Sequence, residues 1–471
     1  MKHTLLVYDT ELKVDIMKKM KMADRLKIVE KNGDVFIYNT VFGNLYRTDR
    51  DTLKFLQSFS EPKLVDENEQ PIKNLRERVF LVEEGKNEYS MLKDGHEKFI
   101  KNLKEGKFLR KLQLMVSTRC NLQCTHCYEA RTGPADAEEG NMDFSVAKKA
   151  LTNFFDIVNN TGQEKVFIRY FGGEPLRNWK VVKDSSEYIK ELETKPEVVQ
   201  AINTNGTLVT NEIAKYLGEN RFDVDLSLEA PNELNDKIRV YRGGRGTFKD
   251  VDEKIDVLIR HNVNPEISAQ LNDYNINHLD DFVDYLKNKG VKKFEVNTLI
   301  CDNNNLCSAP VSEKVKKLVE LKRYAENQGV HLAGKWIRLY NHTLDGTLNY
   351  CSRQGEQLSV NPSGDVFSCS GLSIKLGTID DMRSILSSKE YEEMSMRIVG
   401  NIPGCRNCEV EGMCVGGCRA SGIYSGNNEK YAPEFGECEF RKEIVNAQIG
   451  DKIEREDPAY KSLTARHFTV R

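Results

Sequence analysis

The chain has 471 residues, enough for about three domains of ordinary size. Its 69 Lys and Arg residues nearly balance its 72 Asp and Glu residues, and the net charge of -3 argues against a general nucleic-acid-binding surface. We find no apolar run long enough to cross a bilayer, and the apolar stretch at the start is too short for a signal peptide. We therefore expect a cytoplasmic protein that binds neither nucleic acid nor membrane, whose twelve cysteines are metal ligands or free thiols.

Residues 1–95 predict a small domain of strands and short helices. Apolar alternation over 34–40 and 45–48 predicts a strand pair, 52–59 predicts a short helix, and 79–82 predicts a last strand.

Residues 110–310 alternate predicted strands with predicted helices. The predicted strands are 111–117, 165–171, 198–202, 222–228, 266–271 and 291–299. The predicted helices are 146–158, 209–217, 248–259 and 279–286. Thr247 and Asp250 predict a capping box at the start of the third helix. Six such units imply a parallel sheet with right-handed crossovers, closed into a partial barrel.

Polar or cysteine-rich loops follow the first three predicted strands. Cys120, Cys124 and Cys127 form a CxxxCxxC triplet, residues 172–175 read Gly-Gly-Glu-Pro, and residues 203–206 read Asn-Thr-Asn-Gly. We expect these loops to lie together, because α/β proteins build sites at the carboxyl ends of their strands. Three soft thiolates leave one position open in a four-ligand metal centre, but alone they also fit a partial zinc site or buried thiols.

Seven further cysteines lie in a predicted domain at residues 345–445, before a C-terminal helix or tail at 446–471. Their spacing is Cx12Gx4C, then Cx2Cx5Cx3C, then one more cysteine, and they are Cys351, Cys369, Cys405, Cys408, Cys414, Cys418 and Cys438. Residues 357–369 predict a β-hairpin that carries Cys369 on its second strand. The later pairs alone would favour a zinc ribbon, but the wider pattern includes additional cysteines.

The triplet, the Gly-Gly-Glu-Pro loop and the Asn-Gly loop together resemble the radical S-adenosylmethionine (SAM) superfamily. In that family, three cysteines hold a 4Fe-4S cluster whose fourth iron chelates the amino acid end of SAM, at the mouth of an open (β/α)6 barrel. The resemblance implies that Cys120, Cys124 and Cys127 hold this cluster. It also implies SAM contacts from His126, Gly172, Gly173, Glu174, Asn205, Ser227 and Arg239.

Residues 224–248 resemble the family's SLDGP…HD..R…G.GTF stretch, which implies that Ser227 and Arg239 point toward the ribose and carboxylate of SAM. Glu229 and Ala230 stand here where the family usually has Asp and Gly. His126 stands where tyrosine is more common, near the adenine. These departures concern individual contacts to SAM, and the three cysteines that hold the cluster match the family.

The later cysteines resemble the SPASM domain, which carries two auxiliary 4Fe-4S clusters, so the resemblance implies three clusters. By this match, one auxiliary cluster is held by Cys405, Cys408, Cys414 and Cys438. The other receives three ligands, from Cys351, Cys369 and Cys418. Its fourth iron is either open or bound by Cys301 or Cys307, both of which also fit spare thiols.

Residues 1–95 resemble the leader-peptide recognition element of peptide-modifying enzymes, which captures a precursor by strand addition. A domain that only stabilises the barrel, without binding a peptide, would have the same pattern of strands and helices. Together the resemblances imply a maturase of a ribosomally made precursor peptide, reduced by flavodoxin or ferredoxin. Its 5′-deoxyadenosyl radical would remove a hydrogen atom, and the product would be a cysteine thioether crosslink.

Three other functions stay open. Carbon-carbon crosslinking of a peptide uses the same parts, as does formylglycine formation by anaerobic sulfatase maturases. The non-enzymatic alternative is an iron-sulfur or zinc scaffold that senses redox state, although a sensor has no use for a SAM pocket. We identify no catalytic acid or base from the sequence.

Overall fold

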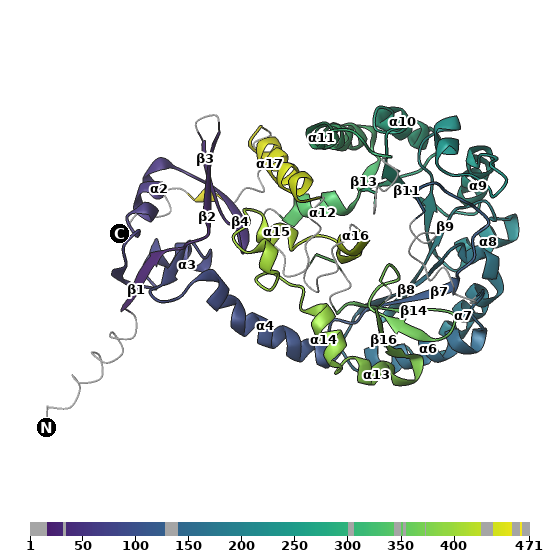
Figure 1. Cartoon of the computed structure of the whole chain (residues 1–471), viewed down its shortest axis with the longest axis horizontal. Coiled ribbons are helices and arrows are strands. Elements are labelled where there is room, and N and C mark those ends of the chain that lie inside the picture. The colour runs from purple at the N-terminus through teal and green to yellow at the C-terminus, as the bar shows by residue number, and fades with distance from the viewer. Residues whose placement is uncertain are drawn as a thin grey trace, which may run out of the picture.

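We describe a computed structural model of the chain that covers residues 17–31, 34–127, 140–299, 306–342, 350–351, 355–372, 374–424, 437–454 and 462–463. Cys301, one of the two candidate fourth ligands, lies outside these residues. A small N-terminal domain lies beside a barrel-like body, and a long helix, α4 (Glu88–Lys104), leads from one to the other (Figure 1). Within the described ranges, no helix has the length and apolar character needed to cross a membrane.

The barrel is built on a ten-stranded sheet with the order β13-β12-β11-β10-β9-β8-β7-β14-β15-β16. Its six predicted strands are confirmed, and neighbours among them pair in parallel. They are β7 (Lys111–Ser117), β8 (Lys165–Gly172), β9 (Glu197–Thr204), β10 (Asp223–Ser227), β11 (Glu266–Leu271) and β12 (Lys293–Thr298). The predicted α/β partial barrel is therefore correct.

Helices surround the strands on the outside (Figure 1). They are α6 (Phe144–Val158), α7 (Trp179–Glu191), α8 (Asn211–Glu219), α9 (Phe248–Arg260), α10 (Leu279–Asn288) and α11 (Val311–Gln328). Short 3-10 turns, η1 (Pro175–Asn178) and η2 (Asn232–Lys237), follow β8 and β10. Two elements beyond residue 310, β13 (His331–Ala333) and α12 (Lys335–His342), add a seventh unit to the predicted six.

The capping box predicted at Thr247 and Asp250 is wrong. The N-terminus of α9 is capped instead by Asp236, whose Oδ1 accepts from the backbone N–H groups of Thr247 at 2.7 Å and Phe248 at 2.8 Å. The Asp250 carboxylate accepts from Tyr241 and Arg245. A carboxylate eleven residues upstream satisfies the free N–H groups, so the local motif is not needed.

Strands β10, β11 and β12 alternate polar and apolar residues along their length. In β11 the apolar residues Ile267, Ala269 and Leu271 are buried in the main core, while Ser268 and Gln270 line a cavity. Because successive side chains of a strand point to opposite faces, the apolar face packs against the helices and the polar face lines the barrel interior.

The C-terminal domain begins as a continuation of the barrel sheet. The predicted hairpin is confirmed as β14 (Gln357–Val360) and β15 (Asp365–Phe367), with β16 (Lys375–Thr378) added beside it. Cys369 does not lie on the second strand as predicted, because β15 ends two residues before it. Strand β14 pairs in parallel with β7, so this domain is hydrogen-bonded to the barrel. Its helices are η3 (Ile379–Asp381), α13 (Met382–Ile385), α14 (Lys389–Ser395), η4 (Pro403–Cys405), α15 (Glu411–Cys414), α16 (Arg419–Tyr424) and α17 (Cys438–Glu454), the last packed on α11 and α12.

The N-terminal domain contains two small sheets, with the orders β5-β1-β6 and β17-β4-β3-β2. The predicted strand pair and short helix are confirmed, whereas β1, β2 and β5 were not predicted. Strand β17, near the C-terminal end of the chain, pairs in parallel with β4. The elements are β1 (Met17–Met22), β2 (Leu26–Lys31), β3 (Asp34–Asn39), β4 (Gly43–Thr48), α2 (Arg50–Gln57), β5 (Lys63–Asp66), α3 (Ile72–Glu77), β6 (Leu81–Glu83) and β17 (Ser462–Leu463).

Candidate cofactor site at the mouth of the barrel

Two glycines at the end of β8 hold the loop that carries the cysteine triplet. The N–H of Gly173 donates to the carbonyl oxygen of Ser117 at 2.7 Å. Gly172 has φ +138°, and a Cβ there would overlap that same carbonyl, while a Cβ on Gly173 would lie 2.6 Å from the backbone of Arg119. Glycine is therefore required by the chain's own backbone just before Cys120, besides any approach to SAM.

All the predicted SAM-contacting residues line one cavity with the triplet. The cavity has a volume of about 250 Å³ and lies where the ends of β7 to β12 meet. Its lining includes the three thiols together with His126, Gly172, Gly173, Glu174, Asn205, Ser227 and Arg239. Residues predicted from four separate loops are thus brought together, although their contacts with SAM stay predictions.

Glu174 links its own Gly-Gly-Glu-Pro loop after β8 to the Asn-Thr-Asn-Gly loop after β9 by hydrogen bonds. Its side chain is fully buried, and its carboxylate accepts from the Thr204 hydroxyl at 2.7 Å and the Asn205 N–H at 2.8 Å, as well as from the Leu176 N–H at 3.0 Å. Burial raises the pKa of this carboxyl to about 7. The Asn205 amide in turn donates to Asn121 Oδ1 at 3.0 Å, on the cysteine loop. This hydrogen-bonded chain joins the three loops.

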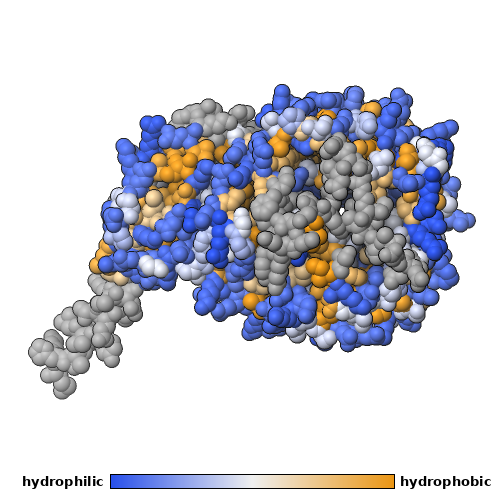
Figure 2. Space-filling view, in the orientation of Figure 1, coloured by the Kyte–Doolittle hydropathy of each residue, from blue (hydrophilic) through white to orange (hydrophobic). Residues whose placement is uncertain are grey.

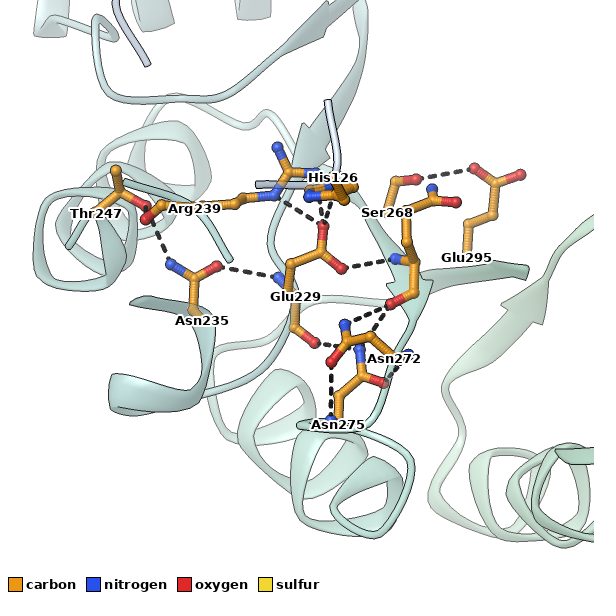
Figure 3. A network of polar contacts seen from close by, with 10 residues as sticks. His126, Glu229, Asn235, Arg239, Thr247, Ser268, Asn272, Asn275 and Glu295 are labelled. Carbon is orange, nitrogen blue, oxygen red and sulfur yellow. Dashed lines mark hydrogen bonds and ion pairs between the residues drawn. The ribbon is translucent and has the colours of Figure 1, made fainter. Parts of the chain in front are cut away.

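Glu229 forms the centre of a buried ionic network (Figure 3). Its side chain is 1% exposed, and Oε1 accepts from Arg239 Nη2 at 2.7 Å and Nε at 2.9 Å. His126 Nε2 lies 3.3 Å from the same oxygen, and Oε2 accepts from the Gln270 N–H at 2.8 Å. Burial alone would raise the pKa of Glu229, but Arg239 and then His126 overcome it and lower the pKa to about 2.

This network explains why the sequence departs from the family at two positions. The longer Glu229 side chain, in place of Asp, reaches both Arg239 and His126. His126, in place of tyrosine, presents a nitrogen to that carboxylate. Glu229 was not predicted as a site residue, and the only sequence signal was the pairing of these two unusual residues.

The four thiols predicted for one auxiliary cluster lie near one another. Burial, and then the charges of Cys414, Cys408 and Cys438, raise the pKa of the Cys405 thiol to about 12. Such mutual effects require short distances. The structure therefore groups these thiols as expected, while their binding of iron stays a prediction.

The other auxiliary group lies toward the amino end of β7. Cys369 and Cys418 belong to one buried cluster, and Cys351 and Cys418 line a second cavity, of about 870 Å³, inside the barrel. Ser370, next to Cys369, accepts from Gln113 of β7 at 3.1 Å.

Cys307 is placed differently from this group. It follows the carboxyl end of β12, beside Ser308, whose N–H donates to Asp273 just after β11. Among the described residues, Cys307 does not line the cavity that contains Cys351 and Cys418. Its position at the opposite end of the barrel disfavours it as the fourth ligand.

The two cavities share part of their lining, which joins the cofactor site to the barrel interior. The shared residues are Phe171, Asn203, Asn297 and Lys335. The polar residues of the interior, such as Arg169 and Glu295, were not predicted as site residues. The signal that could have found Glu295 is the polar-apolar alternation of residues 293–297, and Arg169 stands out as a charge within the apolar run 166–171.

Comparison with known families agrees with this geometry. The radical SAM superfamily model matches residues 114–286, and the model of an iron-sulfur cluster-binding domain, SPASM, matches residues 351–409. The chain belongs to the radical SAM superfamily. It is therefore an enzyme of this superfamily with a C-terminal SPASM domain, and its cysteines supply the soft thiolates that such clusters take.

Several curated proteins are similar to it in sequence. The radical SAM cyclopropyl synthase TigE of Paramaledivibacter caminithermalis is 24% identical, over 92% of this chain and 96% of that protein. An uncharacterized protein of Methanocaldococcus jannaschii is 30% identical, over 59% of this chain and 91% of its own. A serine-type anaerobic sulfatase-maturating enzyme of Bacteroides thetaiotaomicron is 25% identical, over 66% of this chain and 83% of its own.

Solved radical SAM structures share the fold. The enzyme anSMEcpe with bound AdoMet superposes with a TM-score of 0.63 at 21% identity, covering 74% of this chain and 99% of its own. SuiB of Streptococcus suis, bound to S-adenosylmethionine, has a TM-score of 0.55 at 16% identity, covering 89% of this chain and 99% of its own. The second match extends over more of this chain than the first.

Proposed function

We propose that this radical SAM enzyme matures a ribosomally made precursor peptide by forming a cysteine thioether crosslink. The observation that carries the proposal is the 870 Å³ cavity, which shares lining with the cofactor cavity and reaches Cys351 and Cys418. A short peptide segment fits such a volume. Two neighbours of the same fold are described with peptides, anSMEcpe with the Cp18Cys peptide and SuiB with the precursor peptide SuiA.

The residues at the barrel mouth hold the reactants and exclude water. When bound, the first cluster and SAM supply a 5′-deoxyadenosyl radical, which can take a hydrogen atom from unactivated carbon. Leu122, Phe171 and Leu299 line the cofactor cavity with apolar surface. The Glu174 hydrogen bonds and the Glu229 network fix the loops around it, so that the substrate carbon is held in one position.

The three thiols of Cys351, Cys369 and Cys418 support the thioether. A 4Fe-4S cluster takes four ligands, so this set leaves one iron for a substrate cysteine. The position of Cys307 at the far end of the barrel favours this open iron over ligation by Cys307. A thiolate held there would lie in the same cavity as the peptide.

The N-terminal domain supplies a surface for the leader of the precursor. One edge of its four-stranded sheet, at β4, is occupied by β17, whereas β2 pairs only with β3 among the described strands. Strand addition at β2 would continue this sheet. Five of the six exposed large apolar residues of the described chain lie on this domain, and apolar colour gathers there in Figure 2. They are Met17, Ile28, Phe55, Leu64 and Met91.

The test is an anaerobic reaction of the protein, SAM and a chemical reductant or reduced flavodoxin with cysteine-containing peptides encoded beside its gene. We expect a product that has lost two hydrogen atoms and one alkylatable thiol, measured by mass spectrometry before and after iodoacetamide. Formation of 5′-deoxyadenosine without any change in the peptides tested, or no cleavage of SAM, would contradict the proposal.

A second candidate is carbon-carbon bond formation, as in a cyclopropane ring. The similarity to TigE favours it, because this match covers 92% of the chain and includes the N-terminal domain. The product would also lose two hydrogen atoms but would keep every thiol, so iodoacetamide separates the two candidates. Formylglycine formation would instead replace sulfur by oxygen, and the sulfatase maturases match a smaller part of the chain.

A further inference from the structure

The proposed function requires a proton acceptor in the barrel, whichever bond is formed. Forming a carbon-sulfur or carbon-carbon bond within a peptide removes two hydrogens. One leaves as a hydrogen atom to the 5′-deoxyadenosyl carbon. The other leaves as a proton and an electron, and an auxiliary iron-sulfur cluster can accept the electron only. The proton must pass to a base near the reacting peptide.

Most carboxylates on the inner face of the barrel already have strong partners. Glu174 accepts from three donors, and Glu229 is paired with Arg239. Asp225 of β10 is paired with Arg169 of β8. Glu266 of β11 does not line either cavity in the described chain. These four groups are occupied or out of reach of a bound peptide.

Glu295 of β12 differs from all of them. It is the only acidic residue among the described residues that line the 870 Å³ cavity, and it forms no ion pair within the described chain. Its Oε2 accepts from the Ser268 hydroxyl at 3.2 Å. Ser268 lines the cofactor cavity, so Glu295 lies where the two cavities approach each other, on the Ser268 side of the Glu229 network (Figure 3).

The backbone at Glu295 is rigid, and its surroundings favour a thiolate. Strand β12 is paired on both sides, with Ser268 opposite Glu295 on β11 and Ala333 opposite it on β13. The same cavity is lined by the cations Arg110, Lys111, Arg169, Lys335 and Arg338. Positive charges nearby stabilise the anion that remains when a thiol loses its proton.

We propose that Glu295 is the catalytic base of this enzyme, an inference that rests on the proposed function. In the thioether reaction, the substrate S–H bond breaks and its proton passes to the Glu295 carboxylate. The sulfur forms a bond to the substrate carbon that has lost a hydrogen atom, and the remaining electron passes to an auxiliary iron-sulfur cluster. In carbon-carbon bond formation, the same carboxylate takes the proton of the second C–H group as the carbon-carbon bond forms, and the remaining electron again passes to an auxiliary iron-sulfur cluster.

The test compares Glu295→Gln with the wild-type enzyme, both loaded with clusters and SAM, on a fully deuterated precursor peptide. We measure deuterium in 5′-deoxyadenosine, which reports hydrogen-atom abstraction, and crosslinked peptide, which reports completion. We expect the variant to keep deuterium transfer within about threefold, while the ratio of product to deuterated 5′-deoxyadenosine falls by roughly 100-fold or more. Glu295→Asp should recover part of the ratio.

Glu266→Gln is the matched control, because it removes a carboxylate from the neighbouring strand that lines neither cavity. Its ratio of crosslinked peptide to deuterated 5′-deoxyadenosine should equal that of the wild type. Peptide affinity, measured by fluorescence anisotropy, should be unchanged in Glu295→Gln, which separates a base from a residue that only shapes the cavity. A parallel loss of deuterium transfer and product, weaker peptide binding or an unchanged ratio would each overturn the inference. Absence of deuterium transfer in the wild type would instead reject the proposed function.

Discussion

The N–H of Gly412 donates a 2.8 Å hydrogen bond to the carbonyl oxygen of Thr40, which joins the SPASM domain to the turn between β3 and β4. Two further contacts support this junction. Tyr89 donates to Glu411 at 2.7 Å, and Val41 packs in one cluster with Cys405. The N-terminal domain therefore covers the loop that carries the thiols of one predicted auxiliary cluster.

Replacing Gly412 by alanine should loosen this junction, because the added Cβ would overlap the carbonyl oxygen of Val41. Overpacking of this kind costs about 1–3 kcal/mol. We expect Gly412→Ala to lower the melting temperature and to lose about four irons of the auxiliary cluster. Calorimetry and iron analysis check this. Gly243→Ala is the control, since a Cβ there meets no atom within 4 Å, and equal behaviour of the two variants would contradict the expectation.

Iron content tests the number of clusters. We expect about twelve irons in the anaerobically prepared wild-type protein and about eight in the Cys120/Cys124/Cys127 triple alanine variant, measured with sulfide content and Mössbauer spectra. Cys307→Ala should keep all twelve, because Cys307 lies away from the cavity of Cys351. Zinc in place of iron, or no loss in the triple variant, would disprove the assignment.

Glu229→Gln tests the buried ionic network. Removing one partner of a buried pair leaves the other charge uncompensated and costs about 3–5 kcal/mol. We expect this loss of unfolding free energy in denaturant titrations, together with weaker SAM binding in calorimetry, since Arg239 and His126 lose their common acceptor. Asp184→Asn, which breaks the exposed pair with Lys180, should cost at most about 0.5 kcal/mol. Similar losses of unfolding free energy in the two variants would contradict a stabilising role for the buried Glu229 network.

Glu266 should make stability fall as pH rises. Burial, and then the charges of Asp225 and Glu295, raise the pKa of its carboxyl to about 7. The folded state therefore holds this proton more tightly than the unfolded chain, whose Glu has a pKa of about 4.3. The stabilisation is present below about pH 4.3 and is lost as the pH rises through 7. The melting temperature of Glu266→Gln should match the wild type at about pH 4 and exceed it increasingly as the pH rises to 8. A difference in melting temperature between the variant and the wild type that does not change with pH would contradict this prediction.

Local sequence patterns predict single strands and loops, but they do not predict which distant strands pair. The six parallel strands could be predicted because each is a short segment of apolar or alternating polar and apolar residues followed by a polar loop. The cofactor cavity could be predicted because parallel strands bring those loops to one edge. The pairing of β14 with β7 could not be predicted, since nothing near residue 357 marks residue 111 as its partner.

Contacts between distant parts of the chain also decide how α9 is capped and what Glu229 does. The capping box at Thr247 is replaced by Asp236, because the turn η2 carries that carboxylate to the helix end. Glu229 is a departure from the family pattern when read alone, and its role is visible only beside Arg239 and His126. Such roles depend on side chains from different loops, which spacing along the chain does not reveal.

The parallel pairing of β14 with β7 also affects how the chain is made. The two paired positions, Lys111 and Gln357, are separated by 246 residues, because 357 − 111 = 246. At about 5–20 residues per second, the ribosome needs roughly 12–50 seconds to synthesise this stretch. Until β14 emerges, β7 is an unpaired edge strand, which is prone to pair with other chains. The nascent barrel therefore exposes this edge of β7 to other chains until β14 covers it.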